Sequence, residues 1–302
     1  MTNTWISWYQ WYMAMNRAAE LGEFLKSRRA RLEPADVGIG ESGRWRRVVG
    51  LRREEVAPLA GIGVDYYTRL EQGRVQGVSN EVLDAVADAL RLTPAEREYV
   101  RNLSRPPSTE PASRVVRPAV QDLLDSLADT PAYILGPMAD ILAWNQLASA
   151  LFVDFAKLTV QQRNWSHLLF EDERIQALFD DPMIGARDNV AFLRLMNSRY
   201  PNDTEMTDLI ARMLTRSTTF RDLWDKRNVA EKSYCEYLLH HPLVGDMTLG
   251  FQGAFLPDEP GKLLVTYTAA RESASADRLR QLSAHIQHPD RTHPTPIGGR
   301  TH

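Results

Sequence analysis

The stretch LRREEVAPLAGIGVDYYTRLEQGR, residues 51–74, combines arginines, hydroxyl groups and an aspartate with regularly spaced apolar residues. Arginine binds phosphate, and polar side chains can read the edges of bases. Asp65 could accept a hydrogen bond from a cytosine amino group or could cap a helix, and both roles are open. Val64 could meet a thymine methyl group or belong to the core, and Thr68 could touch a base. The other candidates for contact with double-stranded DNA are Arg52, Arg53, Gly63, Tyr66, Arg69 and Arg74, with Arg53 the best placed for a phosphate.

Two short helices would position these residues. Arg53–Ala60 and Val64–Gln72 are separated by Gly61, where a small residue permits a sharp turn, and Gly73 ends the second helix. This pattern is typical of a helix-turn-helix, whose second helix lies in the major groove and which usually binds DNA as a dimer. The apolar residues expected to face the core are Val56, Leu59 and Ala60 in the first helix and Val64, Tyr67 and Leu70 in the second. Glu71 is expected to pair with an arginine within the domain.

Basic charge is concentrated just before this motif, although the whole chain carries a net charge of -3. Between Arg44 and Arg53 there are five arginines and no acidic residue, whereas residues 20–105 as a whole have 15 Lys and Arg against 14 Asp and Glu. The cluster is either a phosphate-contacting surface or an ordinary solvated loop. The five arginines are Arg44, Arg46, Arg47, Arg52 and Arg53.

Composition gives bounds on the class of protein. The length of 302 residues suggests about two domains. No stretch approaches the ~20 apolar residues of a membrane span, and the N-terminus lacks the features of a signal peptide. The single cysteine, Cys235, excludes an intramolecular disulfide and suits a reducing compartment. We therefore expect a cytoplasmic protein.

The predicted N-terminal domain spans residues 20–104 and is all-helical. Its five helices are expected at 20–31, 53–60, 64–72, 80–91 and 94–103, with Ser79 and Thr93 as caps of the last two. Residues 1–19 form an extension whose first part, Met1–Ala14, is rich in Trp and Tyr. It could be an added helix, an interfacial segment, a poorly ordered terminus, or translation from upstream of a true start at Met13 or Met15. Residues 105–116 contain three prolines and form the predicted linker.

The second predicted domain, residues 117–286, mixes helices and strands. Helices are expected near 118–128, 145–154, 159–169, 190–198, 205–215, 220–228 and 279–286, with the third opened by a capping box at Thr159–Gln162. Strands are expected at 132–135, 139–143, 233–239, 248–256 and 263–268. This order indicates an α+β fold in which an antiparallel sheet has helices on one face. Residues 287–302 form a polar tail that we expect to be disordered.

The motif and its flanks resemble a known family. GLRREEVAPLAGIGVDYYTRLEQGR, followed by the helix near 79–91, is similar to the Xre-type, lambda-repressor-like DNA-binding domain of MmyB-like transcription regulators. The segments ILAWNQLASALFVDF and HHPLVGDMTLGFQGAFLPDEPGKLLVTYTAA resemble the second domain of that family. The resemblance covers roughly Leu21 to Ile286. It departs at Gly63, where family members commonly have a serine that can cap the helix with its side chain.

The resemblance implies a PAS-like second domain that binds a small, often fatty-acid-like, ligand. Such a pocket would lie between sheet and helices and have apolar walls. The candidate ligand-binding residues are Trp144, Asn145, Phe170, Phe192, Phe251 and Tyr267. For Trp144 and Asn145 the plainer alternative is a core tryptophan followed by a helix cap.

Other reactive side chains do not form a convincing site. His240 and His241 are adjacent, and neighbouring strand residues point to opposite faces, so we expect no metal site. His167 with Asp172 or Glu173 lacks a nucleophile, and Cys235 is expected to be buried and inert. We predict no catalytic residues and no cofactor.

Together these features predict a transcription regulator and not an enzyme. Its partners would be double-stranded operator DNA, a small apolar ligand, for which the resemblance implies a fatty acid, and a second copy of the chain in a homodimer, with no membrane partner. The ligand would change the affinity for the operator. The alternatives are a DNA-binding protein whose second domain is a protein-interaction module or an enzyme.

Overall fold

The computed structural model describes residues 4–39, 50–75, 77–105, 113–230 and 234–287, with side chains from Arg17 onward. The chain forms two compact units. The first unit comprises Met1–Ala112 and Val190–Glu231, and the second comprises Ser113–Asn189 and Lys232–His302. The division at residue 190 falls inside helix α10 (Pro182–Arg199), which therefore contributes to both. The two units thus divide the chain differently from the continuous domains expected from the sequence.

The N-terminal part of the first unit contains the five predicted helices. They are α1 (Thr4–Arg29), α2 (Arg53–Leu59), α3 (Val64–Glu71), α4 (Asn80–Ala89) and α5 (Pro94–Ser104), with a short 3-10 turn at Pro34–Val37. The predicted caps are confirmed, since Ser79 and Thr93 accept hydrogen bonds from the backbone N–H groups of Val82 and Glu96. Helix α1 begins at Thr4, so the Trp- and Tyr-rich stretch is helical from that residue.

The core of α2 and α3 follows the predicted spacing except at Leu59 and at Val64, which is only half-buried. Tyr67 and Leu70 of α3 are buried, as are Val56 and Ala60 of α2. The prediction for Leu59 was wrong, because its side chain is 43% exposed and Ala57 takes the inward position instead. A helix of seven residues has only a narrow buried stripe, and Leu59 lies outside it.

Two glycines allow α1 to lie close to the end of α3. A Cβ atom on Gly22 would lie 2.3 Å from the carbonyl oxygen of Glu71, and one on Gly73 would lie 2.8 Å from the Cα of Ala19. Gly73 also has a φ of 65°, in the left-handed region that glycine tolerates. Any side chain at either position would force these helices apart.

The first unit also includes the end of α10 with α11 (Thr204–Arg216) and α12 (Thr218–Asp225). Glu20 of α1 accepts hydrogen bonds from Arg194 of α10 (2.6 Å) and from Arg227, which follows α12 (2.5 Å). The predicted helix at 190–198 begins earlier, at Pro182, where the Asp181 side chain accepts from the Met183 N–H.

The second unit is built on one antiparallel sheet in the order β2-β1-β5-β4-β3. The strands are β1 (Ala132–Leu135), β2 (Ile141–Trp144), β3 (Tyr234–His241), β4 (Gly245–Phe255) and β5 (Leu263–Thr268), close to the predicted runs. The prediction of an α+β fold is confirmed. The register places Phe251 opposite both Tyr267 and Cys235, so these side chains share one face of the sheet.

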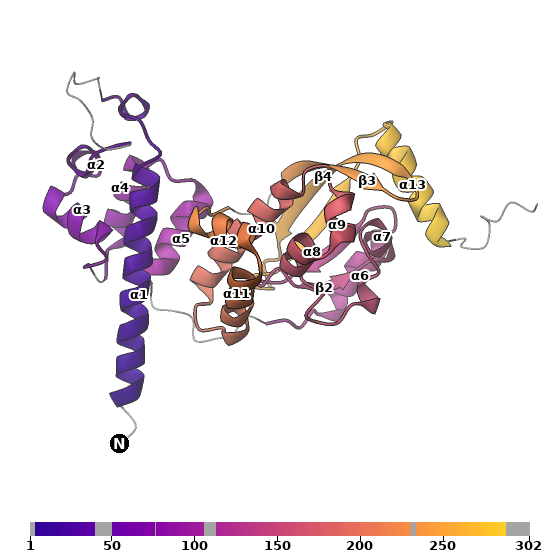
Figure 1. Ribbon diagram of the computed structural model, residues 1–302, viewed down its shortest axis with the longest axis horizontal. Coiled ribbons are helices and arrows are strands. Elements are labelled where there is room, and N and C mark those ends of the chain that lie inside the picture. Colours follow the sequence, from indigo (N-terminus) through magenta and orange to yellow (C-terminus); the bar gives the residue numbers. More distant parts are fainter. Residues whose placement is uncertain (1–3, 40–49, 76, 106–112, 231–233, 288–302) are drawn as a thin grey trace, which may run out of the picture. The chain divides into compact units, whose positions relative to one another are not determined.

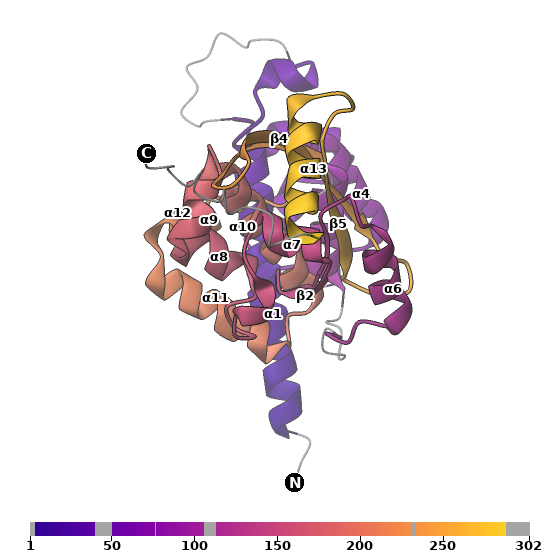
Figure 2. The same ribbon diagram turned by 90° about the vertical axis from the view of Figure 1, so that its right-hand side faces the viewer.

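Helices surround this sheet in the second unit. They are α6 (Pro118–Ser126), α7 (Gln146–Leu151), α8 (Trp165–Glu171), α9 (Glu173–Leu178) and α13 (Ala274–Gln287), with a 3-10 turn at Phe155–Lys157. Helix α13 packs against β4 and α7 (Figures 1 and 2). The reciprocal Thr159–Gln162 bonds form, but they close a turn, and α8 begins later with Asn164 as its cap. Helix α9 was not predicted.

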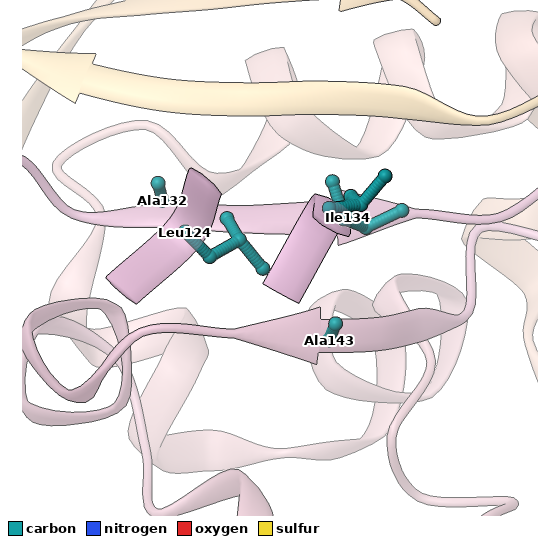
Figure 3. Close-up of a cluster of buried hydrophobic side chains, with 5 residues drawn as sticks. Leu124, Ala132, Ile134 and Ala143 are labelled. Carbon is teal, nitrogen blue, oxygen red and sulfur yellow. The ribbon is translucent and has the colours of Figure 1, made fainter. Parts of the chain in front are cut away.

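Helix α6 covers the opposite face of β1 and β2 from the other helices of the sheet. Val120 and Leu124 of α6 pack on Ala132, Ile134 and Ala143 (Figure 3). Because strand residues alternate, Tyr133 points the other way, toward Trp165 of α8. The interior strand β1 is therefore buried on both faces, whereas the sequence order indicated helices on one face only.

Among the described residues, none of the helices combines the length and apolar character that crossing a membrane requires. The predicted disorder of the tail concerns residues that, apart from Gln287, lie outside the described part of the chain.

We predict that Leu124→Ala lowers the free energy of unfolding of the second unit by about 2–5 kcal/mol, because it leaves a cavity between α6 and β1. Urea denaturation followed by circular dichroism measures this loss. Leu123→Ala is the matched control, since that neighbouring side chain is 41% exposed and should change the value by less than about 0.5 kcal/mol. Equal effects of the two substitutions would contradict the packing of α6 described above.

Candidate functional site

Helices α2 and α3 form a helix-turn-helix with glycines at the turn. Gly61 has a φ of 65°, and the N–H of Ile62 donates to the carbonyl oxygen of Ala57, which closes the turn after α2. Gly63 is the N-cap of α3 and makes no side-chain cap bond. The first turn of α3 thus begins without a side-chain acceptor, as expected for glycine at this position.

Helix α3 separates a buried face from an open one. Tyr67, Leu70 and Glu71 are buried, whereas Asp65 and Arg69 are exposed. Asp65 lies in the first turn, after the Gly63 cap, so capping by Asp65 is not its role here. The remaining predicted DNA contacts divide into the exposed Gly63 and Arg74 and the half-buried Val64, Tyr66 and Thr68.

The buried end of α3 is held by a carboxylate between two arginines. The Glu71 side chain is 0% exposed and accepts from Arg29 Nε (2.6 Å) and Nη2 (3.2 Å) and from Arg53 Nε (2.7 Å). Arg29 also donates to the carbonyl oxygen of Leu51 (2.6 Å). Burial alone would raise the pKa of the Glu71 carboxyl, but the hydrogen bonds from Arg29 and Arg53 outweigh it and hold that pKa below its ordinary value. The predicted internal pairing of Glu71 is confirmed.

This network gives Arg53 an internal role besides the predicted contact with phosphate. Its side chain is half-buried beside Glu71, which fixes the position of its guanidinium group at the start of α2. Arg52 precedes it as the N-cap of α2, and its backbone N–H donates to the Glu55 carboxylate (2.7 Å). Arg44, Arg46 and Arg47 lie outside the described residues.

The second unit has an aromatic cluster between the sheet and its helices. Phe251 and Tyr267 belong to it, with ring centroids 5.6 Å apart. Tyr267 also contacts Phe152 (5.0 Å), which in turn contacts Trp165 (5.1 Å). The full aromatic cluster is Tyr133, Phe152, Trp165, Phe179, Tyr237, Phe251 and Tyr267. Only two of its seven members were among the residues predicted from the sequence.

The other four predicted ligand residues are placed elsewhere. Trp144 is half-buried at the end of β2 and contacts Phe155 (5.6 Å). Phe170 is half-buried on α8, and Phe192 is buried in the first unit. Asn145 is a helix cap, as in the plainer alternative, and the structure shows further duties for its buried side chain.

Asn145 joins three backbone segments of the second unit. Its Oδ1 accepts from the N–H groups of Ala132 (3.1 Å) and Ala148 (2.9 Å), and its Nδ2 donates to the carbonyl oxygens of Leu127 (2.8 Å) and Thr130 (2.7 Å). It also borders an open pocket of about 340 Å³ among α6, α7 and α13. Because its side chain is already hydrogen-bonded to backbone groups, the main role of Asn145 is structural.

Polar groups lie at the edge of the aromatic cluster. The Tyr237 hydroxyl donates to Asp188 of α10 (3.3 Å), and the Cys235 thiol lies 4.0 Å from the same carboxylate. Burial raises the pKa of the Tyr133, Tyr237 and Tyr267 hydroxyls, so they stay protonated at neutral pH. Cys235 is half-buried and not buried as predicted.

One buried polar atom beside this cluster, the acceptor Oδ1 of Asn189, has no hydrogen-bond partner among the described residues. The Asn189 amide nitrogen donates to Ser166 (2.8 Å), which links α10 to α8. The N–H of Trp165 faces the Tyr133 hydroxyl. A buried unpaired acceptor is costly, and its position beside the aromatic rings is suited to a bound polar group.

His167 and His240 contact carboxylates, and His241 contacts backbone groups. His240 contacts Asp246 (2.8 Å) and Asp180 (3.1 Å), and the hydrogen bond to Asp246 is the main reason that the pKa of His240 is raised. His241 points to the buried face, where burial lowers its pKa. His167 contacts Glu171 within α8. In the part of the chain that the structure describes, no three His, Cys, Asp or Glu residues are arranged to hold a metal ion.

Comparison with known proteins identifies both parts of the chain. The sequence model of the ligand-binding domain of MmyB-like transcription regulators matches residues 116–282. A helix-turn-helix domain model matches residues 20–100. Among curated proteins no significant match was found.

We predict that Glu71→Gln lowers the free energy of unfolding of the first unit by about 3–5 kcal/mol at pH 7, because it leaves Arg29 buried without its carboxylate. Since the folded pKa of Glu71 is lowered, its contribution is complete above the unfolded pKa of about 4.3 and is lost as the pH falls through the folded value. Urea unfolding at several pH values should therefore show the two proteins converging in acid. Glu54→Gln, at an exposed position of α2, is the control and should stay close to wild type at every pH.

Proposed function

The chain belongs to the MmyB-like transcription regulators, with a helix-turn-helix DNA-binding part and a ligand-binding domain, and we propose that a small apolar, fatty-acid-like ligand modulates its binding to a specific operator. The DNA-binding part of the proposal rests on one observation, which is that α3 has a buried face and an exposed face. Its inner face is fixed by Tyr67, Leu70 and Glu71, while Asp65 and Arg69 remain exposed. A rigid helix with an exposed polar face is what major-groove binding requires.

We assign roles along α3 by position. Gly63, Val64 and Asp65 start the helix and would approach base edges, with Thr68 and Arg69 one turn further along. The guanidinium of Arg69 lies 5.9 Å from the Tyr66 ring, a contact that restrains both side chains on the outer face. Arg52, Arg53 and Arg74 would contact phosphates.

The aromatic cluster supports the ligand part of the proposal. Phe251 and Tyr267 lie at its centre, and an apolar chain could replace ring–ring contacts there if the rings moved aside. The Trp165 N–H and the Tyr133 hydroxyl, which face one another, would then donate to a carboxylate head group. Trp144 and Phe170 would contribute less directly, and Asn145 would support the walls through the backbone. Phe192, which belongs to the first unit, is not part of the proposed site.

Further proposals concern the fold type, the assembly and the location. The strand order β2-β1-β5-β4-β3, with helices α7–α12 between β2 and β3 in the sequence, supports a PAS-like domain within residues 117–286. We propose a homodimer because one helix-turn-helix reads only a half-site.

A cytoplasmic location follows from the proposed contact with operator DNA. The alternative is that the second domain is an enzyme or a protein-interaction module. A lipid bound to the purified protein would favour the ligand-binding domain over this alternative.

We predict different effects for base and phosphate contacts. Arg74→Gln should weaken binding to all duplexes and lower the salt slope, d log K/d log [salt], by about one, because one phosphate contact is lost. Asp65→Ala should instead change the preferred sequence, with a discrimination of about 1–3 kcal/mol at one base pair. Fluorescence anisotropy at several salt concentrations, together with selection from a random duplex library, measures both.

Arg101→Gln is the matched control, because this arginine lies on α5 and pairs with Asp84 (2.6 Å). It should leave affinity and preference unchanged. If the Arg74→Gln and Asp65→Ala variants both bind the selected duplexes with wild-type affinity, α3 is not the helix that contacts the bases.

We predict that the purified protein carries a lipid. Native mass spectrometry should show an added mass that disappears after delipidation, and dodecanoate should restore it. Phe251→Asp should abolish retention, because a charge within the aromatic cluster opposes an apolar chain. Gln252→Asp, at an exposed position on the opposite face of β4, is the control and should retain the lipid. No added mass in any preparation, with dodecanoate included, would favour the protein-interaction alternative.

A further inference from the structure

The first unit contains a pocket of about 420 Å³ among α1, α5, α10, α11 and α12. This pocket is distinct from the aromatic cluster, whose residues all belong to the second unit. Its size suits a small organic molecule. The lining side chains most relevant to binding are Arg17, Glu20, Tyr99, Arg194, Thr207 and Trp224.

Arg17 is a buried cation in the pocket wall, with only 7% of its surface exposed. It donates to the carbonyl oxygens of Ser198 (3.3 Å), Arg105 (3.1 Å) and Asn102. Among the described residues these bonds go to backbone, and no carboxylate pairs with Arg17. Burial lowers the pKa of the Arg17 guanidinium, although it remains charged at neutral pH.

Arg194 is a second buried cation, with 4% of its surface exposed. Its Nη1 donates to Glu20 (2.6 Å), and its guanidinium lies 4.2 Å from the centre of the Trp224 ring. Its Nε is buried and has no partner among the described residues. An unpaired N–H on a buried guanidinium is a ready donor to a further anion.

The charges around the pocket do not balance. Glu20 already accepts from Arg194, from Arg227 (2.5 Å) and from the Tyr99 hydroxyl (2.8 Å). The pocket lining therefore holds two guanidinium groups, those of Arg17 and Arg194, and one carboxylate, that of Glu20, which leaves an excess of one positive charge (two minus one). Arg227 lies outside the lining and also interacts with the Glu23 carboxylate. Buried charges are usually paired, so the pocket is suited to an additional anion.

We propose that this pocket binds a small organic carboxylate whose charged group lies between Arg17 and Arg194. Guanidinium groups bind carboxylates with paired, directional hydrogen bonds. The rings of Tyr99 and Trp224 provide an apolar wall for the body of the molecule. Helices α1 and α5 precede the ligand-domain match and α10–α12 lie inside it, so a bound carboxylate joins side chains from both segments.

Benzoate is a suitable probe because it combines a carboxylate with a flat ring, and benzamide is its neutral isostere. Isothermal titration calorimetry on the full chain should show binding of benzoate and none of benzamide. Arg17→Gln should weaken benzoate at least about tenfold, since a charged hydrogen bond is lost. Thr207→Trp should have a similar effect while leaving both arginines in place, because it fills the mouth of the pocket.

Arg199→Gln removes the same charge from α10 outside the pocket and is the matched control. It should bind benzoate within about twofold of wild type. The proposal is overturned if benzamide binds as tightly as benzoate, if Arg199→Gln loses as much affinity as Arg17→Gln, or if Thr207→Trp keeps the wild-type affinity. Thr207→Trp decides the matter if Arg17→Gln does not fold.

Discussion

The placement of α3 depends on one buried carboxylate. Glu71 is fully buried, and its two oxygens are bound by Arg29 and Arg53, which come from the end of α1 and the start of α2. Three helices are thereby fixed at a single point, and the close approach at Gly22 and Gly73 leaves them no room to slide. The outer face of α3 can carry polar side chains without weakening the fold, because its inner end is held by paired charges.

Local signals in the sequence identified most elements and missed the distant pairings. Ser79 and Thr93 mark helix starts by short-range capping bonds, so α4 and α5 were predicted within a few residues. Thr159 and Gln162 make the same hydrogen bonds but close only a turn. A capping pattern predicts these local hydrogen bonds and does not by itself predict that a helix follows them. Arg29 and Glu71 are 42 residues apart, and no pattern in the sequence indicates which arginine pairs with Glu71.

The ligand site was harder to predict than the DNA site for a related reason. Base-reading residues follow from positions along one helix, whereas the aromatic cluster gathers side chains from four strands, one helix and the C-terminal ends of two others. Alternation could have indicated Tyr133 and Tyr237, since each shares a strand face with buried neighbours. Nothing local distinguishes Phe192, which the structure places in the other unit, from Phe251, which is central.

Helix α1 is the element through which the helices of the first unit interact. Its Gly22 and Arg29 contact α3, while its Glu20 binds arginines of α10 and of the segment after α12. Helix α10 also carries Asp188 and Asn189, which lie beside the aromatic cluster of the second unit. Helix α10 therefore contributes side chains to the ion pairs of the first unit with its C-terminal half and to the edge of the aromatic cluster with its N-terminal half.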